Sequence, residues 1–411
     1  MLSPRRILTI IPFLAMAAFG CGSGDRSAGF SVTDSAGVTI AISTGPSWQA
    51  SEGWVFADQP SVDIGVVDGA ADYQLFRVAN TVRMTNGNIV VANSGTQEIR
   101  CYDTDGNHVW SAGGEGGGPG EFERLYRIAV FADSIIAFDS RYYRVSVFDT
   151  SGVYVRSATL DDPKGVLNGV FSDGSLLMTE SDIRTQLQRR VLGDREEIDD
   201  GSVRLNDIAL RHSGSGEFLD SLRLFPGAEG VIGTRASGDQ IAVSFSYKPF
   251  GRSAVFAVRD NHLLAGTQDR YEIATYAMDG ELVSLLRRDF VNRTITDRHI
   301  DLLRDQYLDG IEDADAIRER TDEFQGLPKP ETMPAYRSII VDSDGLLWVE
   351  EYRLPDEAPE WTVFDHDLRM LGTVKTPLGL TVHQIGKDFV LGTWRDEFDV
   401  EHVRLHDLVR Q

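Results

Sequence analysis

The sequence predicts an all-β protein, a β-propeller of six four-stranded antiparallel blades. Three observations carry this prediction. A short apolar run recurs six times, most copies are followed by two strands joined at a tight turn, and one unpaired strand precedes the first copy. Repeats of this kind are typical of propellers, because a single unit cannot bury both of its faces alone.

The recurring apolar run is the main evidence for repetition. Each copy follows a turn residue, continues through a few mostly apolar residues, and ends at a polar residue. A run of this length between turn residues predicts a strand that is buried on both faces. The six copies occupy residues 88–93, 134–139, 175–180, 262–267, 345–350 and 388–393.

An alternating strand, a tight turn and another strand follow most of these runs. The pattern occurs at Ile99–Gly106, Val145–Gly152 and Ile273–Gly280, and Trp361–Leu368 keeps it without the glycine. Glycine at the turn allows the positive φ that a hairpin needs, and alternation marks half-buried strands. Each unit therefore holds about four strands in about 40 to 45 residues, the length of a propeller blade.

The two ends of the repeat region predict how the ring closes. The last unit continues through Val403–His406 and is one strand short, while an unpaired strand, Ser61–Val66, precedes the first unit. We predict that this N-terminal strand closes the last blade, which leaves no open sheet edge. Residues 31–43, with a turn at 35–37, are expected to form an outer hairpin packed on the rim.

Two spacings between the runs are longer than the others. The third and fourth runs are separated by a charged stretch, Arg184–Asp200, which we interpret as a surface insertion, and Ile241–Phe245 is a candidate strand of an extra blade. The fourth and fifth runs are separated by a predicted small helical insertion at about 296–326. Thr296 can cap its first helix, and a second helix is expected from about Asp313 to Phe324.

The N-terminal residues predict export. Residues 1–20 contain two arginines followed by an apolar run, Ile7–Phe19. This run is shorter than the about 20 residues that span a bilayer, and it fits a secretory signal peptide. We predict that Cys21 is lipidated, that 21–29 form a lipid-anchored tether, and that 30–411 form the propeller. The alternative is an ordinary cleaved signal with an incidental cysteine.

The residues after Cys21 predict the final location. Gly22 and Ser23 follow it, without the aspartate that serves as an inner-membrane retention signal. We therefore expect an exported protein that is lipid-anchored in the outer membrane and faces the periplasm, if the host has two membranes. No later apolar run is long enough for a transmembrane helix, so contact with the membrane is expected through the lipid anchor only.

Charge narrows the class of partner. The net charge is −23, from 63 acidic and 40 basic side chains. Such a surface repels phosphate backbones, which argues against nucleic acid as a partner. We expect a monomer with a protein or glycan partner in the cell envelope. The second cysteine, Cys101, lies in an alternating strand and is expected to be a small buried core residue.

Two segments resemble a known repeat family. Gly113–Phe122 is similar to the glycine-rich linker between blades of NHL-repeat propellers, and Arg144–Gly152 is similar to their Arg-Val-x-Val-Phe-Asp-x-x-Gly strand pair. The whole layout resembles the six-bladed propeller lipoproteins of bacterial cell envelopes, in which Tyr73–Val78 and Gly392–Glu397 match recognisable signatures. The resemblance implies a fold and a location, but little chemistry, because the functions of that group are not known.

The expected ligand-binding face lies where loops of neighbouring blades meet around the central channel. Residues just past the apolar runs are therefore candidate ligand-binding residues. Their carboxylates, arginines and aromatic rings suit a polar ligand or a peptide, but Asp and Asn at strand ends often bond only to local backbone. The candidates are Asn93, Asp139, Arg141, Tyr142, Glu180, Glu350, Tyr352, Trp394, Arg395 and Asp396.

No motif predicts a cofactor, but calcium or another divalent cation in the channel is an alternative. Propellers related by resemblance include lactonases that hold such a cation with Glu, Asn and Asp, and a lyase that acts on cyclic peptides. Glu350, Asn93 and Asp139 have the right chemical types. His383, on the expected innermost strand of the last blade, is interpreted as a core or channel histidine rather than a general base.

Two functions follow from these observations. The first is a non-catalytic binding scaffold that contacts a protein or glycan ligand through its channel face, because no catalytic constellation is recognisable. The second is a divalent-cation-dependent hydrolase or lyase with its site in the channel, because carboxylates gather at the strand ends. Fold alone does not decide between an enzyme and a binding protein.

Overall fold

The structure, a computed structural model, describes residues 26–27, 29–49, 52–192, 201–237 and 240–410. The expected signal peptide, the candidate lipidation site Cys21 and most of the expected tether lie outside these residues. In the part of the chain that the structure describes, no helix is long and apolar enough to cross a membrane.

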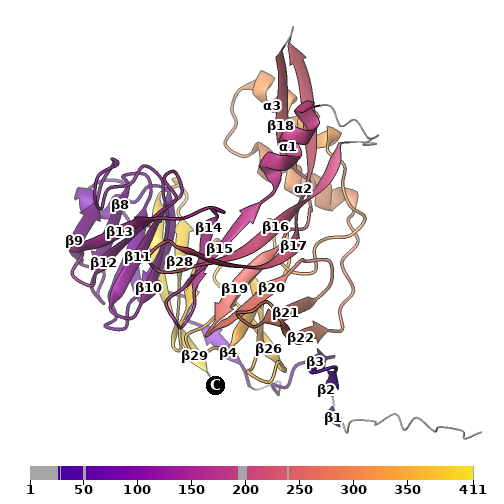
Figure 1. Ribbon diagram of the computed structural model, residues 1–411, viewed down its shortest axis with the longest axis horizontal. Helices are drawn as coiled ribbons and strands as arrows, with labels where there is room; N and C mark the ends of the chain where they lie inside the picture. The colour runs from indigo at the N-terminus through magenta and orange to yellow at the C-terminus, as the bar shows by residue number, and fades with distance from the viewer. Residues whose placement is uncertain (1–25, 28, 50–51, 193–200, 238–239, 411) are drawn as a thin grey trace, which may run out of the picture.

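Six mostly antiparallel sheets form the blades of a propeller (Figure 1). The innermost strand of each blade contacts the innermost strand of the next, and the ring closes where the sixth blade meets the first. The predicted fold class is therefore confirmed. Each of the six apolar runs forms the second strand of a blade, and most of the residues in these strands are buried.

Blades 1, 2 and 5 have the four-stranded form that the repeat predicts. Blade 1 consists of β6 (Val78–Arg83), β7 (Ile89–Asn93), β8 (Glu98–Tyr102) and β9 (His108–Gly113). Blade 2 consists of β10 (Leu125–Phe131), β11 (Ser134–Asp139), β12 (Arg144–Asp149) and β13 (Tyr154–Thr159). Blade 5 consists of β23 (Ser338–Val341), β24 (Leu347–Glu350), β25 (Glu360–Phe364) and β26 (Met370–Lys375).

Blade 3 contains the first long spacing and has five strands. They are β14 (Val166–Val170), β15 (Leu176–Ser181), β16 (Ser202–His212), β17 (Phe218–Ser237) and β18 (Gln240–Tyr247), with α1 (Ile183–Leu192) between β15 and β16. The candidate strand of an extra blade, residues 241–245, lies in β18, which pairs with β17 at the outer edge of this sheet. The spacing therefore extends one blade and adds no seventh.

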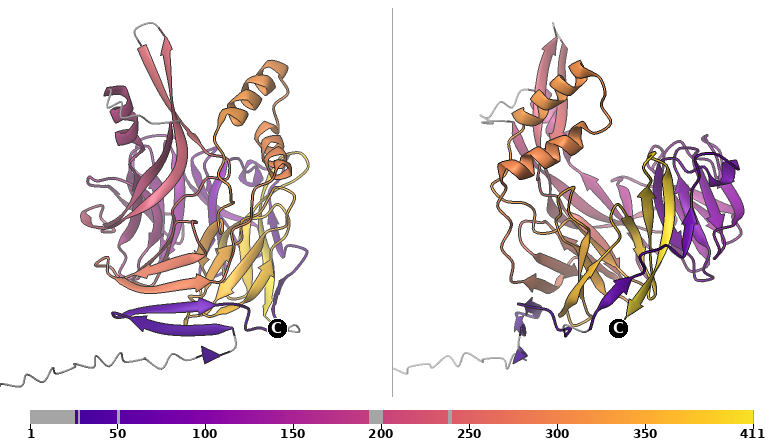
Figure 2. Two further views of the ribbon diagram at one scale, coloured as in Figure 1. Left: turned by 90° about the vertical axis from the view of Figure 1, so that its right-hand side faces the viewer. Right: turned by 180° about the vertical axis from the view of Figure 1, so that it is seen from behind.

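Blade 4 carries the predicted N-terminal hairpin on its outer edge. The blade consists of β19 (Val255–Arg259), β20 (His262–Gly266), β21 (Glu272–Tyr276) and β22 (Leu282–Arg288). The hairpin consists of β2 (Phe30–Ser35) and β3 (Val38–Ser43), and the short β1 (Arg26–Ser27) pairs with β2. Because β3 pairs with β22 in parallel, the hairpin extends the sheet of blade 4 (Figure 2).

Blade 6 is closed by the N-terminal strand, as predicted. Its own strands are β27 (Thr381–Ile385), β28 (Phe389–Arg395) and β29 (Glu401–Arg410). The outer edge of β29 pairs with two early strands, β5 (Val62–Ile64) and β4 (Trp54–Phe56). The short 3₁₀ helix η1 (Ala71–Tyr73) then leads to blade 1. The ring is thus joined by backbone hydrogen bonds between residues more than 300 positions apart.

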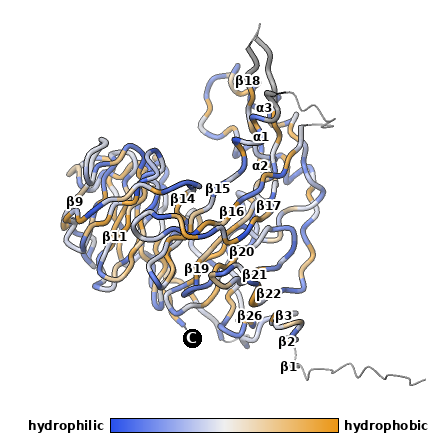
Figure 3. Tube along the Cα trace, viewed as in Figure 1, coloured by the Kyte–Doolittle hydropathy of each residue, from blue (hydrophilic) through white to orange (hydrophobic). Residues whose placement is uncertain are grey.

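The hydrophobic core is divided into layers between adjacent blades. Along β7, Val90 and Ala92 pack against blade 2, whereas Ile89 and Val91 pack against blade 6. Successive side chains of a strand point to opposite faces, so a strand in this position needs an unbroken apolar run. Figure 3 shows apolar residues concentrated along the strands of the blades.

The hairpin turn that ends at Leu368, which has no glycine, adopts the same positive-φ conformation as the turns that contain one. Gly106, Gly152 and Gly280 have φ values of +82°, +82° and +81°, and Leu368 has φ +63°. A residue with a side chain is strained in this region. Leu368 is only 5% exposed and belongs to the layer between blades 4 and 5, so its burial offsets this cost.

The helical insertion forms two helices, α2 (Asp297–Leu308) and α3 (Ala314–Gly326). Thr296 is the N-cap of α2, as predicted, and its amide donates to His299 Nδ1. Asp313 caps α3 by accepting hydrogen bonds from two backbone amides. The helices and the long β17–β18 hairpin project from one side of the molecule, and the N-terminal hairpin lies on the opposite side (Figure 2).

Candidate ligand-binding channel

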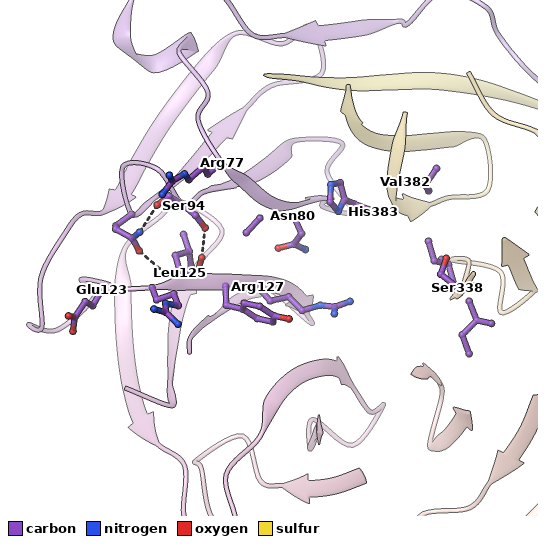
Figure 4. Close-up of a pocket in the computed structure, with 15 residues that line it drawn as sticks. Arg77, Asn80, Ser94, Glu123, Leu125, Arg127, Ser338, Val382 and His383 are labelled. Carbon is purple, nitrogen blue, oxygen red and sulfur yellow. Dashed lines mark hydrogen bonds between the residues drawn. The ribbon is translucent and has the colours of Figure 1, made fainter. Parts of the chain in front are cut away.

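The centre of the propeller contains a cavity of about 670 Å³. It is lined by residues of four innermost strands, β6, β10, β23 and β27, and by the loops that precede β6 and β10 or follow β7 (Figure 4). Its size is within the range of small-molecule sites. The lining residues include Arg77, Asn80, Ser94, Gln97, Glu123, Arg124, Tyr126, Arg127, Ser338 and His383.

Three arginines make this cavity electropositive within an acidic protein. Arg77, Arg124 and Arg127 line it, and among the described residues none of them forms an ion pair. Glu123 is the one carboxylate in the lining, and its nearest cationic partner is Arg141 outside the cavity, at 3.8 Å. The cavity therefore offers an anionic ligand guanidinium groups that no carboxylate already holds.

Arg127 lies at the centre of this arrangement. Its side chain extends from β10 toward the side of the cavity formed by β27 (Figure 4). Loss of hydration lowers the pKa of its guanidinium, although the group stays charged at neutral pH. A cation that has lost water without gaining a carboxylate destabilises the empty protein, and an anionic ligand would relieve this cost.

His383 faces the same cavity from β27, the innermost strand of blade 6. One ring nitrogen, Nε2, lies 3.1 Å from Thr393 Oγ1. Burial, and secondarily the charge of Arg127, lowers the pKa of His383 to about 4. The imidazole is therefore neutral at physiological pH and can act as a hydrogen-bond donor or acceptor. The prediction of a core or channel position for this residue agrees with the structure.

The channel wall between blades 1 and 2 is held by polar side chains that bond to backbone groups of the neighbouring blade, as a paired strand would. Asn80 Oδ1 accepts from the amide of Ile128 at 2.8 Å, and Asn80 Nδ2 donates to the carbonyl of Ile128 at 3.0 Å. Gln97 Oε1 accepts from the amide of Leu125 at 2.7 Å. Ser94 Oγ donates to the carbonyl of the same Leu125. The arginines thus project from a rigid frame.

None of the ten sequence-predicted candidates lines this cavity. Asn93 is fully buried, and its Oδ1 accepts from the amide of Phe76 at 2.8 Å. Asp139 occupies the same position in blade 2, and its oxygens accept from the amides of Glu123, Arg141 and Tyr142. These two side chains hold the loops that carry cavity residues.

Three further candidates lie on or near blades 2 and 3. Arg141 has a side chain that is 63% exposed and faces Glu123. Tyr142 stacks under the guanidinium of Arg144 at 5.2 Å, and its pKa is raised chiefly by a hydrogen bond to Glu123. The pKa of Glu180 is raised chiefly by burial.

The two candidates of blade 5, Glu350 and Tyr352, contact different parts of the molecule. Glu350 Oε2 accepts from Ser338 Oγ at 2.7 Å, and Ser338 lines the channel, so Glu350 lies one contact away from it. Arg337 and Arg353 both lie 3.6 Å from Glu350 Oε1. Tyr352 instead packs near Phe250 beneath the helices, where burial raises its pKa.

The candidates of blade 6 form a local network. Arg395 makes 2.6 Å contacts with Asp399 and Glu401, and the hydrogen bond that it donates to Asp399 is the main reason that its pKa is raised. Asp396 Oδ1 accepts from two amides of its own turn. The ring of Trp394 lies 3.4 Å from the guanidinium carbon of Arg404. Glu401 also accepts from the amide of Val78, which ties this network to blade 1.

The three candidate cation ligands are not brought together. Asn93, Asp139 and Glu350 belong to different blades, and their oxygens already accept the hydrogen bonds described above. In the part of the chain that the structure describes, no group of three or more His, Cys, Asp or Glu side chains is placed to hold a metal ion.

Comparison with known families agrees with the blade architecture. A family model described as a 6-bladed beta-propeller, DUF5128, matches residues 71–189. The matched segment covers blades 1 and 2 and the beginning of blade 3. Among curated proteins, no sequence matches this chain.

Solved structures with a similar outline share little sequence with this chain. A Bacteroides fragilis protein that is named as an expected exported protein is 12% identical to this chain. The match covers 90% of this chain and 99% of that protein, with a TM-score of 0.48. A DUF4221 family member from Bacteroides vulgatus is 9% identical, covering 88% and 100%, with a TM-score of 0.49. The virginiamycin B lyase of Staphylococcus aureus is 11% identical, covering 82% and 98%, with a TM-score of 0.38. None of these likenesses carries a ligand or an activity over to this chain.

Sequence reasoning found one channel residue, His383, and missed the arginines. The missed residues lie on or just before the first strand of a blade, whose pattern is weaker than that of the second strand. Arg77 directly precedes β6, and Arg127 lies within β10. Each of these strands comes just before an apolar run. A search for basic residues at that position would have found them.

Proposed function

We propose that this protein is an exported cell-envelope lipoprotein, anchored through Cys21, whose propeller is a non-catalytic scaffold that binds an acidic ligand in its channel. The ligand is an acidic glycan or an acidic segment of a protein partner. One observation supports this proposal above the others: Arg77, Arg124 and Arg127 line one cavity, and none of them forms an ion pair within the part of the chain that the structure describes. An anion would supply the missing countercharge.

The dimensions of the cavity favour a short acidic oligosaccharide over a folded partner. A volume of about 670 Å³ suits a ligand of a few sugar rings. Tyr126 provides an aromatic face from blade 2, and Asn80, Ser338 and His383 provide polar groups from three other blades. Few polar groups at fixed positions are typical of sites that select a ligand by orientation.

Calorimetric titration tests the proposal. The probes are a short oligogalacturonide, a neutral maltooligosaccharide of equal length and an oligoglutamate peptide. We expect one of the two acidic probes to bind and the neutral sugar not to bind. Arg127→Gln should weaken binding by about tenfold or more, because a hydrogen bond to a charged group contributes roughly 1.5–3 kcal/mol.

The matched control is Arg298→Gln. Arg298 lies in α2 and has a side chain that is 76% exposed, so this change removes the same charge far from the channel. It should leave the affinity unchanged. Equal binding of acidic and neutral probes, or equal losses in the two variants, would contradict the proposal.

The second candidate, a cation-dependent hydrolase or lyase, has less support. Its candidate ligands Asn93, Asp139 and Glu350 already hold loops and neighbouring side chains through hydrogen bonds. Thermal denaturation with and without calcium separates the two functions. A large stabilisation by calcium would favour the enzyme, because a ligand that binds only the native state raises its stability.

A further inference from the structure

A second cavity, of about 550 Å³, lies where the N-terminal hairpin meets blades 4 and 5. It shares no lining residue with the channel. Its walls come from β2 and β3, from the ends of β19 and β20, from the paired strands β21 and β22, and from the turn between β25 and β26. The hairpin therefore completes a site that the six blades alone would leave open.

One wall of this cavity carries a row of hydroxyl groups. Thr275 of β21 is paired in register with Ser284 of β22, and Ser284 is paired with Thr39 of β3. All three residues line the cavity. Side chains at registered positions of adjacent strands project from the same face of a sheet. The row consequently presents three hydrogen-bond donors to whatever fills the space.

Cationic and imidazole side chains face this row from two hairpin turns. Arg259 ends β19 and His262 begins β20, while His366 and Arg369 belong to the turn between β25 and β26. Asp367 is the one carboxylate in the lining, and it is exposed. Among the described residues, neither Arg259 nor Arg369 forms an ion pair.

Both arginines bury donor atoms that have no partner among the described residues. These atoms are Arg259 Nη1 and Arg369 Nε. The guanidinium of Arg369 stacks on the ring of Phe30 at 4.7 Å, which fixes its plane while leaving its edge available. Burial lowers the pKa of Arg259, against the opposing charge of Asp260. Buried donors without acceptors are costly, and because these two atoms are themselves buried, a ligand in the cavity would be held by the other N–H groups of the two guanidiniums.

We propose that this cavity is a phosphate-binding site, in which Arg259 and Arg369 pair with the phosphate oxygens and the hydroxyl row of Thr39, Thr275 and Ser284 donates to them. Guanidinium groups match phosphate geometry through paired N–H donors. Hydroxyl donors add hydrogen bonds that a phosphate, with several acceptor oxygens, can accept together. The apolar rim formed by Phe30 and Val32 suits an organic group attached to the phosphate.

The phosphate can come from two sources that share this chemistry, a free phosphate ion or a phosphorylated head group. Phe30 follows Cys21 by nine residues. A lipid at Cys21, as proposed above, would therefore hold the hairpin near a surface that is rich in phosphodiesters. Binding of a soluble phosphate does not depend on this anchor, so the two proposals fail independently.

Titration of the purified protein with inorganic phosphate and with glycerophosphoglycerol, the soluble head group of an anionic phospholipid, tests the site. Binding of inorganic phosphate supports a site for free phosphate, and binding of glycerophosphoglycerol alone supports a site for a head group. The double variant Arg259→Gln with Arg369→Gln should weaken binding of the active probe by about a hundredfold, about tenfold for each arginine. If neither probe binds, the proposal is overturned.

A matched control and a milder variant keep the result interpretable. The double variant Arg298→Gln with Arg318→Gln removes the same charge from side chains that are each 76% exposed in the helical insertion. It should bind phosphate as the wild type does, and an equal loss would overturn the proposal. Thr275→Val removes one hydroxyl and keeps the shape, so it should weaken binding several-fold even if the double arginine variant fails to fold.

Discussion

Asn80 of β6 and Ile128 of β10 exchange two hydrogen bonds across the boundary between blades 1 and 2. Among the described residues, the innermost strand β10 has no neighbouring strand on its channel side. The side-chain amide of Asn80 provides there the hydrogen bonds that a neighbouring strand would make. Ile128 is only 1% exposed. If Asn80 were removed, the amide and carbonyl of Ile128 would therefore have neither a protein partner nor water to bond to. This pair joins two blades, and Asn80 also lines the channel.

Replacement of Asn80 should therefore destabilise the propeller. We expect Asn80→Leu to lower the free energy of unfolding by about 2–4 kcal/mol, because two buried backbone groups become unsatisfied. Urea denaturation followed by circular dichroism measures the change. The control is Asn86→Leu, which removes one hydrogen bond in an exposed turn and should cost about 1 kcal/mol or less. Equal losses would show that the Asn80 bonds have no special weight.

Closure of the ring predicts a large effect from a small change near the N-terminus. Ile64 of β5 is fully buried between blades 6 and 1. Ile64→Ala should lower the free energy of unfolding by roughly 2–5 kcal/mol, the usual cost of this truncation in a core. Val67, three residues later, is 72% exposed, so Val67→Ala should have little effect. Similar small effects of both variants would mean that β5 contributes little to closure.

The partly buried, neutral His383 predicts a loss of stability in mild acid. Its pKa is lowered from 6.5 to about 4, chiefly by burial and also by Arg127. As the pH falls below 6.5, the unfolded chain binds a proton that the folded protein does not, so the unfolded state is favoured. The contribution is fully present above pH 6.5 and is lost progressively between pH 6.5 and 4, amounting to roughly 3 kcal/mol.

Comparison of wild type with His383→Asn isolates this contribution. Both proteins lose stability in acid as their carboxylates titrate, but only the wild type carries the histidine. We expect the wild type to lose at least about 2 kcal/mol more than the variant between pH 7 and pH 4.5 in urea denaturation. Parallel losses in the two proteins would show that the imidazole is freely protonated in the folded state.

Lipidation at Cys21 is tested by membrane fractionation. Cys21→Ser should move the protein to the soluble fraction, because the lipid is proposed as its only attachment to a membrane. Cys101→Ser is the matched control. Cys101 is a free, buried cysteine, and burial raises the pKa of its thiol to about 11, so it stays protonated and unreactive. Retention of both variants in the membrane fraction would reject the anchor.

The fold could be predicted from the sequence because blades are repeated local units. Residues 88–93 and 134–139 show the same apolar run, and each lies between the same kinds of turn. Such runs depend only on the alternation of side chains along a strand and on burial from both sides. The unpaired strand Ser61–Val66 was placed by the rule that open sheet edges are unfavourable.

The candidate site could be predicted only in part. Strand-end residues such as Asn93 and Asp139 were expected near the channel, and they do hold its loops through backbone hydrogen bonds. Their types suited a ligand and a local hydrogen bond equally well, and a sequence does not show which amide lies within reach. The extent of blade 3 was equally undecided, because the pairing of β18 with β17 depends on a long hairpin.

The sequence by itself determined the repeated four-stranded unit, the strand that closes the ring and the helices of the insertion, since each of these shows as a pattern within a short segment. Whether Ile241–Phe245 belongs to an extra blade was decided by the tertiary structure. Only the tertiary structure decided which side chains meet. Arg77, Arg124 and Arg127 share a cavity with His383 although they lie between 256 and 306 positions away from it along the chain. Arg259 and Arg369 meet beneath the N-terminal hairpin for the same reason. Propeller geometry brings distant segments together, so residues far apart in the chain line one cavity.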